Sequence, residues 1–143
     1  VCMVKLIRSY DFTSSEFFDY IEDSLTKEIK KARNNNKPIK IKAGTIYTLT
    51  GKDDTSTKVT INEFRRNELY SATFESMGEK LTVNYYTRDT PKGCTITLDE
   101  TVHSYDPSQH NKLANFFYDF MYHRSAQEEL NKLAKSIAEF KNK

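Results

Sequence analysis

Glu100 and His123 are the two side chains whose types and positions could support acid–base chemistry. Glu100 falls on the apolar face of the alternating segment 93–104. A carboxyl group in an apolar cavity has a raised pKa, and it can act as a general acid or orient a polar ligand. His123 could exchange a proton with it. The interpretation that the sequence favours is simpler: Glu100 lies near a strand end, in water or paired with Arg124 or another base, and His123 lies on an exposed helix surface.

Aromatic side chains suit a pocket for an apolar molecule that carries a polar end. Tyrosine offers an apolar ring with a hydroxyl group, although it suits a half-buried strand or helix edge without a ligand equally well. With Glu100 and His123, the predicted ligand-binding residues are Tyr47, Tyr70, Phe74, Tyr85, Leu98, Phe116 and Phe120. Further tyrosine candidates are Tyr86, Tyr118 and Tyr122.

The sequence carries no motif for a metal ion or a cofactor. The three histidines, His103, His110 and His123, match no zinc spacing with Cys94, and His103 and Cys94 have opposite parity on one strand. A Gly-rich phosphate loop, a nucleophile elbow and a paired-acid signature are all missing. We therefore expect neither a metal nor a cofactor. A binding protein is favoured over an enzyme, and the catalytic residues stay unassigned.

The charge balance and the hydropathy pattern limit the partners. Among 143 residues, 22 Lys and Arg stand against 20 Asp and Glu, so the formal net charge of +2 does not favour a nucleic-acid partner. No apolar run is long enough to span a bilayer. Residues 1–7 are interrupted by Lys5, followed by Arg8, and lack the pattern of a signal peptide. We expect a cytoplasmic protein with free thiols, a small apolar ligand as its partner, and a homodimer as an open alternative.

The elements that would position these residues begin with a strand and a helix. Residues 2–12 predict a strand, and the segment from Thr13 to Glu16 has the form of a capping box that starts a helix. The helix should end before Pro38. Its apolar stripe recurs every four residues: Phe17, Ile21, Leu25 and Ile29.

From Gly44 onward the hydrophobic period changes to two, which is typical of strands. The breaks between the strands are short and rich in turn residues, so consecutive strands should pair antiparallel as a meander. The predicted strands cover 44–50, 56–65, 68–77, 80–89 and 93–104. In the last of them, one face carries Cys94, Ile96, Leu98, Glu100 and Val102.

The last third of the chain, from about Pro107, predicts one long amphipathic helix with Asp106 as its N-cap. Its apolar stripe has an aromatic half up to Met121 and an aliphatic half from Leu130. The polar segment 123–127 between them predicts a bend or a cavity-lining stretch. Lysines alternate near the end with three acidic residues that we expect on a solvated face: Glu128, Glu129 and Glu139.

The order of these elements predicts the architecture. An amphipathic helix that follows a run of strands must bury its stripe, and one face of the sheet is the large apolar surface on offer. We therefore predict a single α+β domain over residues 1–143 with a helix-grip fold. A curved antiparallel sheet of about six strands, in the order β-α-β-β-β-β-β-α, would wrap on the C-terminal helix and leave a cavity between them.

Residues spread over nearly the whole chain fit a known pattern. They are Phe17-Phe18, Ser24-Leu25, Glu28-Ile29, Gly44, Tyr47, Lys58, Tyr70, Phe74-Glu75-Ser76, Glu100, Phe117, Met121-Tyr122 and Arg124-Ser125. With this element order the chain resembles the START-like, or SRPBCC, helix-grip superfamily, which includes pollen-allergen-like ligand binders, polyketide cyclases and Hsp90-activator-type domains. More narrowly, it is similar to a domain-of-unknown-function family of low-GC Gram-positive bacteria.

The resemblance implies an internal cavity and, from gene neighbours in sugar phosphotransferase systems, a link to carbohydrate metabolism. It implies no catalytic residue. Three functions stay open. The favoured one is binding of a small apolar or amphipathic ligand between the sheet and the C-terminal helix. The second is a cyclase- or hydrolase-like enzyme that uses Glu100 and His123. The third is a protein-interaction domain of the Hsp90-activator type, with a cavity filled by Phe74, Phe116 and Phe120.

Overall fold

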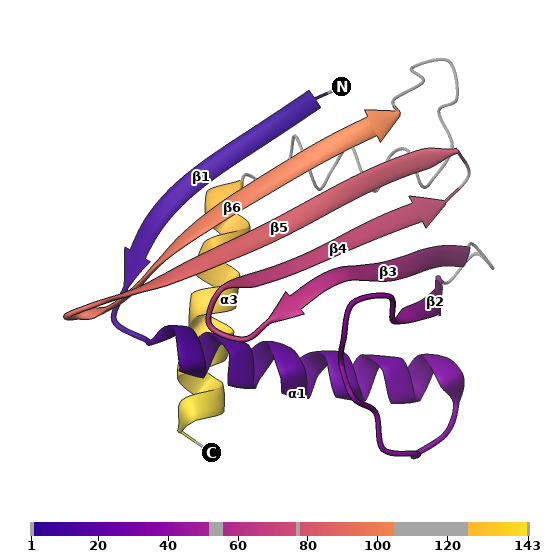
Figure 1. The fold of residues 1–143 in the computed structure, drawn as a ribbon, viewed down its shortest axis with the longest axis horizontal. Coiled ribbons are helices and arrows are strands. Elements are labelled where there is room, and N and C mark those ends of the chain that lie inside the picture. Colours follow the sequence, from indigo (N-terminus) through magenta and orange to yellow (C-terminus); the bar gives the residue numbers. More distant parts are fainter. Residues whose placement is uncertain (1, 52–55, 77, 105–125, 143) are drawn as a thin grey trace.

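The structure, a computed structural model, describes residues 2–51, 56–76, 78–104 and 126–142. These residues form an α+β fold with a six-stranded antiparallel sheet and two helices, which confirms the predicted fold class (Figure 1). The elements are β1 (Cys2–Tyr10), α1 (Ser14–Arg33), β2 (Ile46–Thr50), β3 (Ser56–Arg65), β4 (Leu69–Ser76), β5 (Glu79–Thr90), β6 (Gly93–Ser104) and α3 (Ala126–Lys141). The earlier part of the predicted C-terminal helix, up to residue 125, lies outside the described residues.

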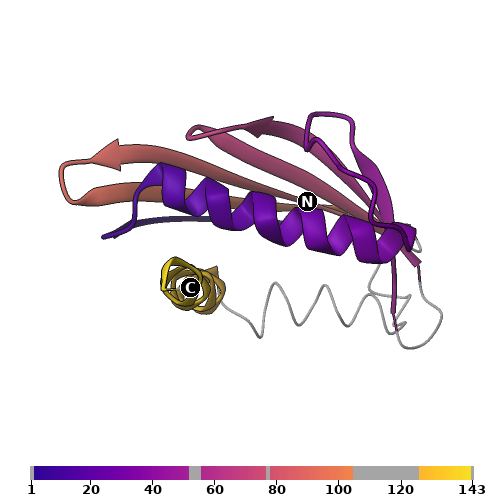
Figure 2. The same ribbon diagram turned by 90° about the horizontal axis from the view of Figure 1, so that it is seen from below.

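The strand order in the sheet is β1-β6-β5-β4-β3-β2, and every neighbouring pair is antiparallel. The predicted meander is therefore confirmed for β2 to β6. The first strand, β1, pairs with the last, β6, in a register that runs from Cys2 opposite Val102 to Tyr10 opposite Cys94. The sheet is curved, and Figure 2 shows α1 and α3 on the same side of it. Both helices therefore cover one face and leave the other face bare in this view.

Helix α1 starts and ends as local side-chain chemistry predicts. Thr13 Oγ1 accepts from the backbone N–H of Glu16 at 3.1 Å, and the backbone N–H of Thr13 donates to Glu16 Oε1 at 2.9 Å. This capping box satisfies two N–H groups that a helix start would otherwise leave unpaired. Asn34 ends the helix in the left-handed conformation, with φ 52°. The buried apolar stripe is Phe17, Phe18, Ile21, Leu25 and Ile29.

The core lies between the helix-covered face of the sheet and the two helices. The alternation predicted for β6 is confirmed, since Cys94, Ile96 and Leu98 are fully buried. Leu130 and Ile137 bring α3 into the same buried cluster. Within the described residues this cluster joins elements from both ends of the chain. Burial of apolar surface at about 25 cal/mol per Å² is therefore the main force that holds α3 against the rest of the fold.

Polar contacts fix α3 near both of its ends. Near its start, Arg8 Nε on β1 donates to Gln127 Oε1. Near its end, Lys141 Nζ lies 2.9 Å from Glu16 Oε2, the same carboxylate that closes the capping box of α1. Within the described ranges, neither helix combines the length and apolar character that crossing a membrane requires.

The turn between β5 and β6 brings two backbone segments unusually close. A Cβ atom placed on Gly93 would lie 2.1 Å from the backbone oxygen of Tyr10. Real Cβ atoms do not approach so closely, so a glycine is required where β6 begins beside the end of β1. This close approach lies where the chain leaves β1 toward α1.

Candidate functional site

Glu100 is buried in the interior of the fold, with an exposed fraction of 2%. Its neighbours across the sheet are Val4 on β1 and Val83 on β5. The expectation that Glu100 lies in water at a strand end is wrong, because β6 is an interior strand with a partner on both sides. Arg124, the base considered as its partner, lies outside the described residues.

Glu129 on α3 lies close enough to the Glu100 side chain to change its pKa. Burial first, then the Glu129 carboxyl group and the charge of Asp99, together raise the pKa of Glu100 to about 8. The Glu100 carboxyl group is therefore protonated at neutral pH. Glu100 Oε1 has no hydrogen-bond partner. A buried carboxyl oxygen is thus left unsatisfied beside Glu129.

Glu129 is a functional candidate that the sequence interpretation missed. It was expected on a solvated face, but it is half-buried and contacts the sheet through Glu100. Glu128 and Glu139 are exposed, as predicted. The available signal was helical spacing, because Glu129 lies four residues before Leu133 and therefore beside the apolar stripe.

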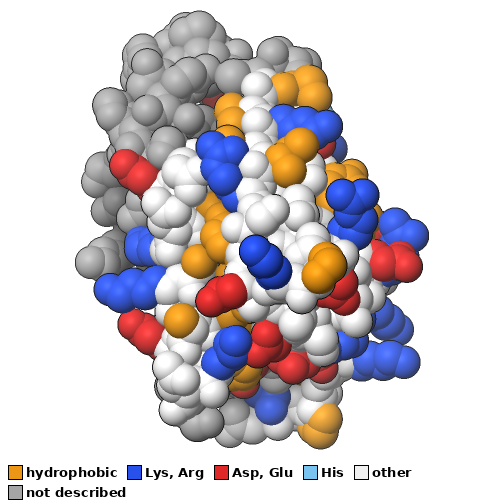
Figure 3. Space-filling view, turned by 90° about the vertical axis from the view of Figure 1, so that its left-hand side faces the viewer, with side chains coloured by type: hydrophobic (Ala, Val, Ile, Leu, Met, Phe, Trp, Pro, Cys, Tyr) orange, Lys and Arg blue, Asp and Glu red, His pale blue; other side chains and the backbone are white. Residues whose placement is uncertain are grey.

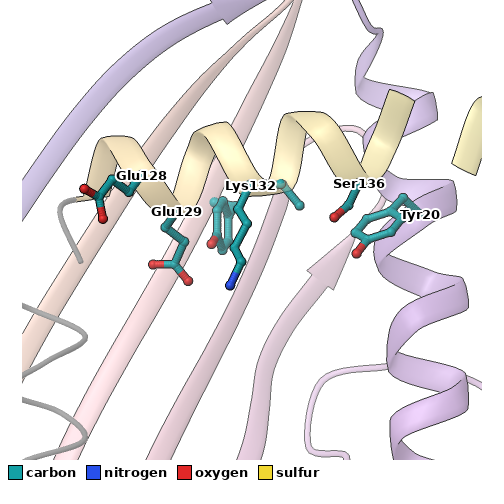
Figure 4. A pocket seen from close by; sticks show the side chains of 7 residues that line it. Tyr20, Glu128, Glu129, Lys132 and Ser136 are labelled. Carbon is teal, nitrogen blue, oxygen red and sulfur yellow. The ribbon is translucent and has the colours of Figure 1, made fainter. Parts of the chain in front are cut away.

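A pocket of about 490 Å³ lies beside this acid pair (Figure 4). Its described walls come from α1, β5 and α3. Figure 4 shows Glu129 and Lys132 extending to the same side of α3, and Tyr20 of α1 lying near Ser136. The described lining residues are Tyr20, Tyr85, Glu128, Glu129, Lys132, Leu133 and Ser136.

Tyr85 links the pocket to the aromatic core. Its ring stacks on Tyr70, with ring centres 6.0 Å apart and planes inclined by 4°, and it lies 5.7 Å from the Phe17 ring. Burial raises the pKa of the Tyr85 phenol, and the charges of Glu129 and Glu100 raise it further. The ring is therefore held rigidly and its hydroxyl group stays neutral near the acid pair.

Tyr47 lies at a different point, beneath the second half of α1. Its hydroxyl group donates to Glu28 Oε2 at 2.5 Å, and the side chain is buried. Burial, followed by this hydrogen bond, raises the pKa of Tyr47. Because Glu28 occupies the hydroxyl group, Tyr47 serves the packing of α1 on β2.

The remaining predicted residues are not brought together at the pocket. Leu98 is fully buried in β6 and Phe74 is half-buried against the core, and neither is among the described lining residues. Tyr86 is 43% exposed and is not among the described lining residues of this pocket. The predicted residues that lie outside the described part of the chain are Phe116, Phe120 and His123, with Tyr118, Tyr122 and His110.

The bare face of the sheet carries His103, opposite in parity to Cys94 as predicted. His103 is exposed, and its Nε2 lies 3.0 Å from Thr82 Oγ1. Another side of the molecule, in Figure 3, mixes basic and acidic side chains without a continuous area of one sign.

Over residues 4–122 the sequence matches the family described as Domain of unknown function (DUF3284). The chain belongs to the DUF3284 family. The match covers the first helix and the whole sheet except the first two residues of β1, and it includes Glu100 and Tyr85. It ends before α3, so Glu129 and most of the described pocket wall lie beyond the matched part of this DUF3284 chain. Among curated proteins, no match is found.

Solved structures share the fold of this DUF3284 chain. Protein MLL2253 from Mesorhizobium loti has a TM-score of 0.64 at 12% identity, covering 96% of this chain and 98% of its own. Ara h 8.0201 gives 0.63 at 11% identity, covering 97% and 96%. Norcoclaurine synthase from Thalictrum flavum gives 0.58 at 12% identity, covering 97% and 85%. At such identities the likeness shows a common helix-grip fold.

Proposed function

We propose that this protein binds a small amphipathic molecule in the pocket between α1, β5 and α3, with the Glu100–Glu129 pair engaging its polar end. One observation carries the proposal. Glu100 is almost completely buried, yet its Oε1 atom has no hydrogen-bond partner. Leaving a buried polar atom unsatisfied costs about 1–3 kcal/mol, and a ligand that donates a hydrogen bond at the pair would remove that cost.

The pocket has the size and the wall composition of a small-molecule site. Its volume of about 490 Å³ falls in the usual range for such sites. Tyr85, Tyr20 and Leu133 offer apolar surface, while Glu129 and Ser136 offer polar groups at defined positions. Burial of the ligand's apolar part would drive binding at about 25 cal/mol per Å², before the cost of ordering the ligand.

The shared fold adds support for a START-like assignment, because norcoclaurine synthase and Ara h 8.0201 have the same architecture. The single-domain organisation, the cytoplasmic location and the low-GC Gram-positive origin stay predictions. The ligand-binding roles of Tyr70, Phe74 and Leu98 also stay predictions. These side chains would act indirectly, by packing behind the wall of the pocket.

Native mass spectrometry of freshly purified protein tests the proposal. We expect a bound small molecule in protein from at least one of several expression hosts. Ser136→Trp should fill the pocket and abolish this adduct, whereas Lys135→Trp, on the exposed side of the same helix, should retain it. A protein that carries no small molecule from any host would contradict a tight-binding carrier.

A second candidate function, an acid–base enzyme, is favoured by the Glu100 carboxyl group alone. With a pKa raised to about 8, mainly by burial, it is protonated at neutral pH and could act as a general acid. Among the described residues, Glu129 is the acid that lies beside Glu100. If a turned-over substrate is found, Glu100→Gln should retain binding and lose turnover, and undiminished turnover would exclude this role.

A further inference from the structure

Positive charge is concentrated in one segment of the chain, residues 27–42. This segment contains seven of the 22 Lys and Arg residues and a single acid, Glu28, so its formal net charge is +6. The whole chain carries only +2, and the residues outside the segment are therefore net negative. Such a distribution gives this segment a positive potential that the overall charge does not reveal.

Most of these cations have no carboxylate partner in the part of the chain that the structure describes. Lys27 lies 2.9 Å from Asp23, and Arg33 donates to the backbone oxygen of Ile46 at 2.8 Å. The described ion pairs involve none of the other five cations, which are Lys30, Lys31, Lys37, Lys40 and Lys42. Their charge is therefore available to a partner.

The dipole of α1 accounts for only part of this charge. Cations in the last turn of a helix face its negative end, which suits the basic residues from Lys30 to Arg33. The effect falls off within that turn, and α1 ends at Arg33. The lysines beyond the helix end, Lys37, Lys40 and Lys42, are not explained by the helix dipole.

The connection from α1 to β2 directs lysines outward. Ile41 is buried and Ile39 packs against the same core, while the alternate residues Lys40 and Lys42 are exposed. This alternation is that of an extended segment, so anchoring of the isoleucines turns the lysines to solvent. A backbone hydrogen bond of 2.8 Å from Gly44 holds the end of the connection against β3. Figure 1 shows the connection at the C-terminal end of α1, away from α3.

We propose that the basic end of the molecule, residues 27–46, docks on the surface of an anionic lipid membrane. Clusters of four to eight Lys and Arg are attracted to anionic headgroups, and each cation near the surface changes the affinity by about fivefold. Ile46 lies beside Arg33 and is 46% exposed, so an apolar side chain is positioned to enter the headgroup region next to the cations. This docking is independent of ligand binding in the pocket.

The composition of the basic end favours lipid over other polyanions. Six of its seven cations are lysines, which are hydrated point charges without the fork that arginine uses to recognise phosphates and bases. No aromatic residue falls between positions 27 and 46, so an unpaired base has no ring on which to stack. Protein interfaces are depleted in lysine. An array of unpaired lysines matches the diffuse negative charge of a membrane.

Co-sedimentation of the full chain with vesicles tests this inference. Phosphatidylcholine vesicles with about one third phosphatidylglycerol should bind the protein at low salt, and pure phosphatidylcholine vesicles should not. Because exposed charges are screened over about 10 Å at 0.1 M salt, raising the salt from about 0.05 M to about 0.5 M should release the protein. Equal binding to both vesicles, or binding unchanged at the higher salt, would overturn the inference.

Two sets of variants locate the binding surface. Removal of three charges beyond the helix end should weaken vesicle binding on the order of a hundredfold, whereas removal of three charges from exposed positions elsewhere should weaken it less than about threefold. The test substitutions are Lys37→Gln, Lys40→Gln and Lys42→Gln. The control substitutions are Lys5→Gln, Lys92→Gln and Lys135→Gln. Equal weakening by the two sets would show that the basic end is not the docking surface.

A duplex oligonucleotide and poly-glutamate separate lipid from the other anionic partners. At the same salt and the same concentration of negative charge, we expect both to bind more weakly than the phosphatidylglycerol vesicles. Tighter binding of either one would overturn the assignment to lipid.

Discussion

The carboxyl group of Glu100 on β6 lies close to that of Glu129 on α3, and this neighbour adds to the effect of burial in raising the pKa of Glu100. Glu129 lies in the first turns of α3, two residues after Gln127, whose side chain accepts from Arg8 on β1. The protonation state of Glu100 affects both the stability of the fold and the chemistry of the pocket.

Stability should fall as pH rises because of Glu100. The folded pKa of about 8 lies above the value of about 4.3 for glutamate in an unfolded chain. Between these values the folded protein holds a proton that the unfolded chain has lost. The stabilising effect is complete below the unfolded pKa and disappears as pH rises through the folded one, for a change on the order of a few kcal/mol. Urea unfolding between pH 5 and pH 9 measures it.

The Glu100→Gln variant isolates this contribution from other ionisable groups. Its amide group is uncharged at every pH and has nearly the same volume, so its free energy of unfolding should change less between pH 5 and pH 9 than that of the natural protein. Glu139→Gln is the matched control on the exposed side of α3 and should follow the natural protein. Parallel stability curves for Glu100→Gln and the natural protein would refute the buried acid pair.

Gly93→Ala should destabilise the fold by about 3 kcal/mol or more. The added Cβ atom would lie 2.1 Å from the Tyr10 oxygen, so the backbones of β1 and β6 would have to separate. Gly44→Ala is a suitable comparison, because its Cβ atom meets nothing within 4 Å and only the φ of +90° is unfavourable, at about 1 kcal/mol. Thermal unfolding of both variants provides the test. Equal losses would show that the close approach at Gly93 has no energetic consequence.

Thr13→Ala should cost about 1 kcal/mol of folding free energy, since the backbone N–H of Glu16 loses its acceptor at the start of α1. The exposed neighbouring residue provides a control, because Ser15→Ala removes a hydroxyl group of the first turn without removing the cap. Chemical denaturation distinguishes the two variants. If Ser15→Ala were as costly as Thr13→Ala, helix propensity rather than capping would explain the loss.

Cys94 should react with iodoacetamide only when the fold opens. Burial, with a further contribution from Asp89, raises the pKa of its thiol to about 11, so at pH 8 only about one molecule in a thousand carries the thiolate. Peptide mass spectrometry would follow alkylation at this position in buffer and in increasing urea. Modification in the native protein at the rate of a free cysteine peptide would show that the inner face of β6 is accessible.

The predictions that the structure confirms were based on local sequence patterns. The capping box at Thr13 and the alternation that ends at Val102 depend on residues close together in the sequence. The depth of Glu100 does not, because it depends on β1 and α3, which lie at opposite ends of the chain. The sequence could not show that Glu129 lies beside Glu100, for the same reason. The exposure of Tyr86 could have been predicted from the sequence, since it follows the buried Tyr85 in a strand and adjacent side chains point to opposite faces.

The pairing of β1 with β6 also affects how the chain folds. Cys2 lies opposite Val102, about 100 positions later, whereas the strands from β2 to β6 pair with sequence neighbours across short turns. Loop closure over the longer span costs more entropy, and non-local strand pairing is slow. We expect the hairpins of the meander to form early. Strand β1 should join last, when it pairs with the free edge of β6. Pulse-labelled hydrogen exchange during refolding would then show β4 and β5 amides protected before those of β1.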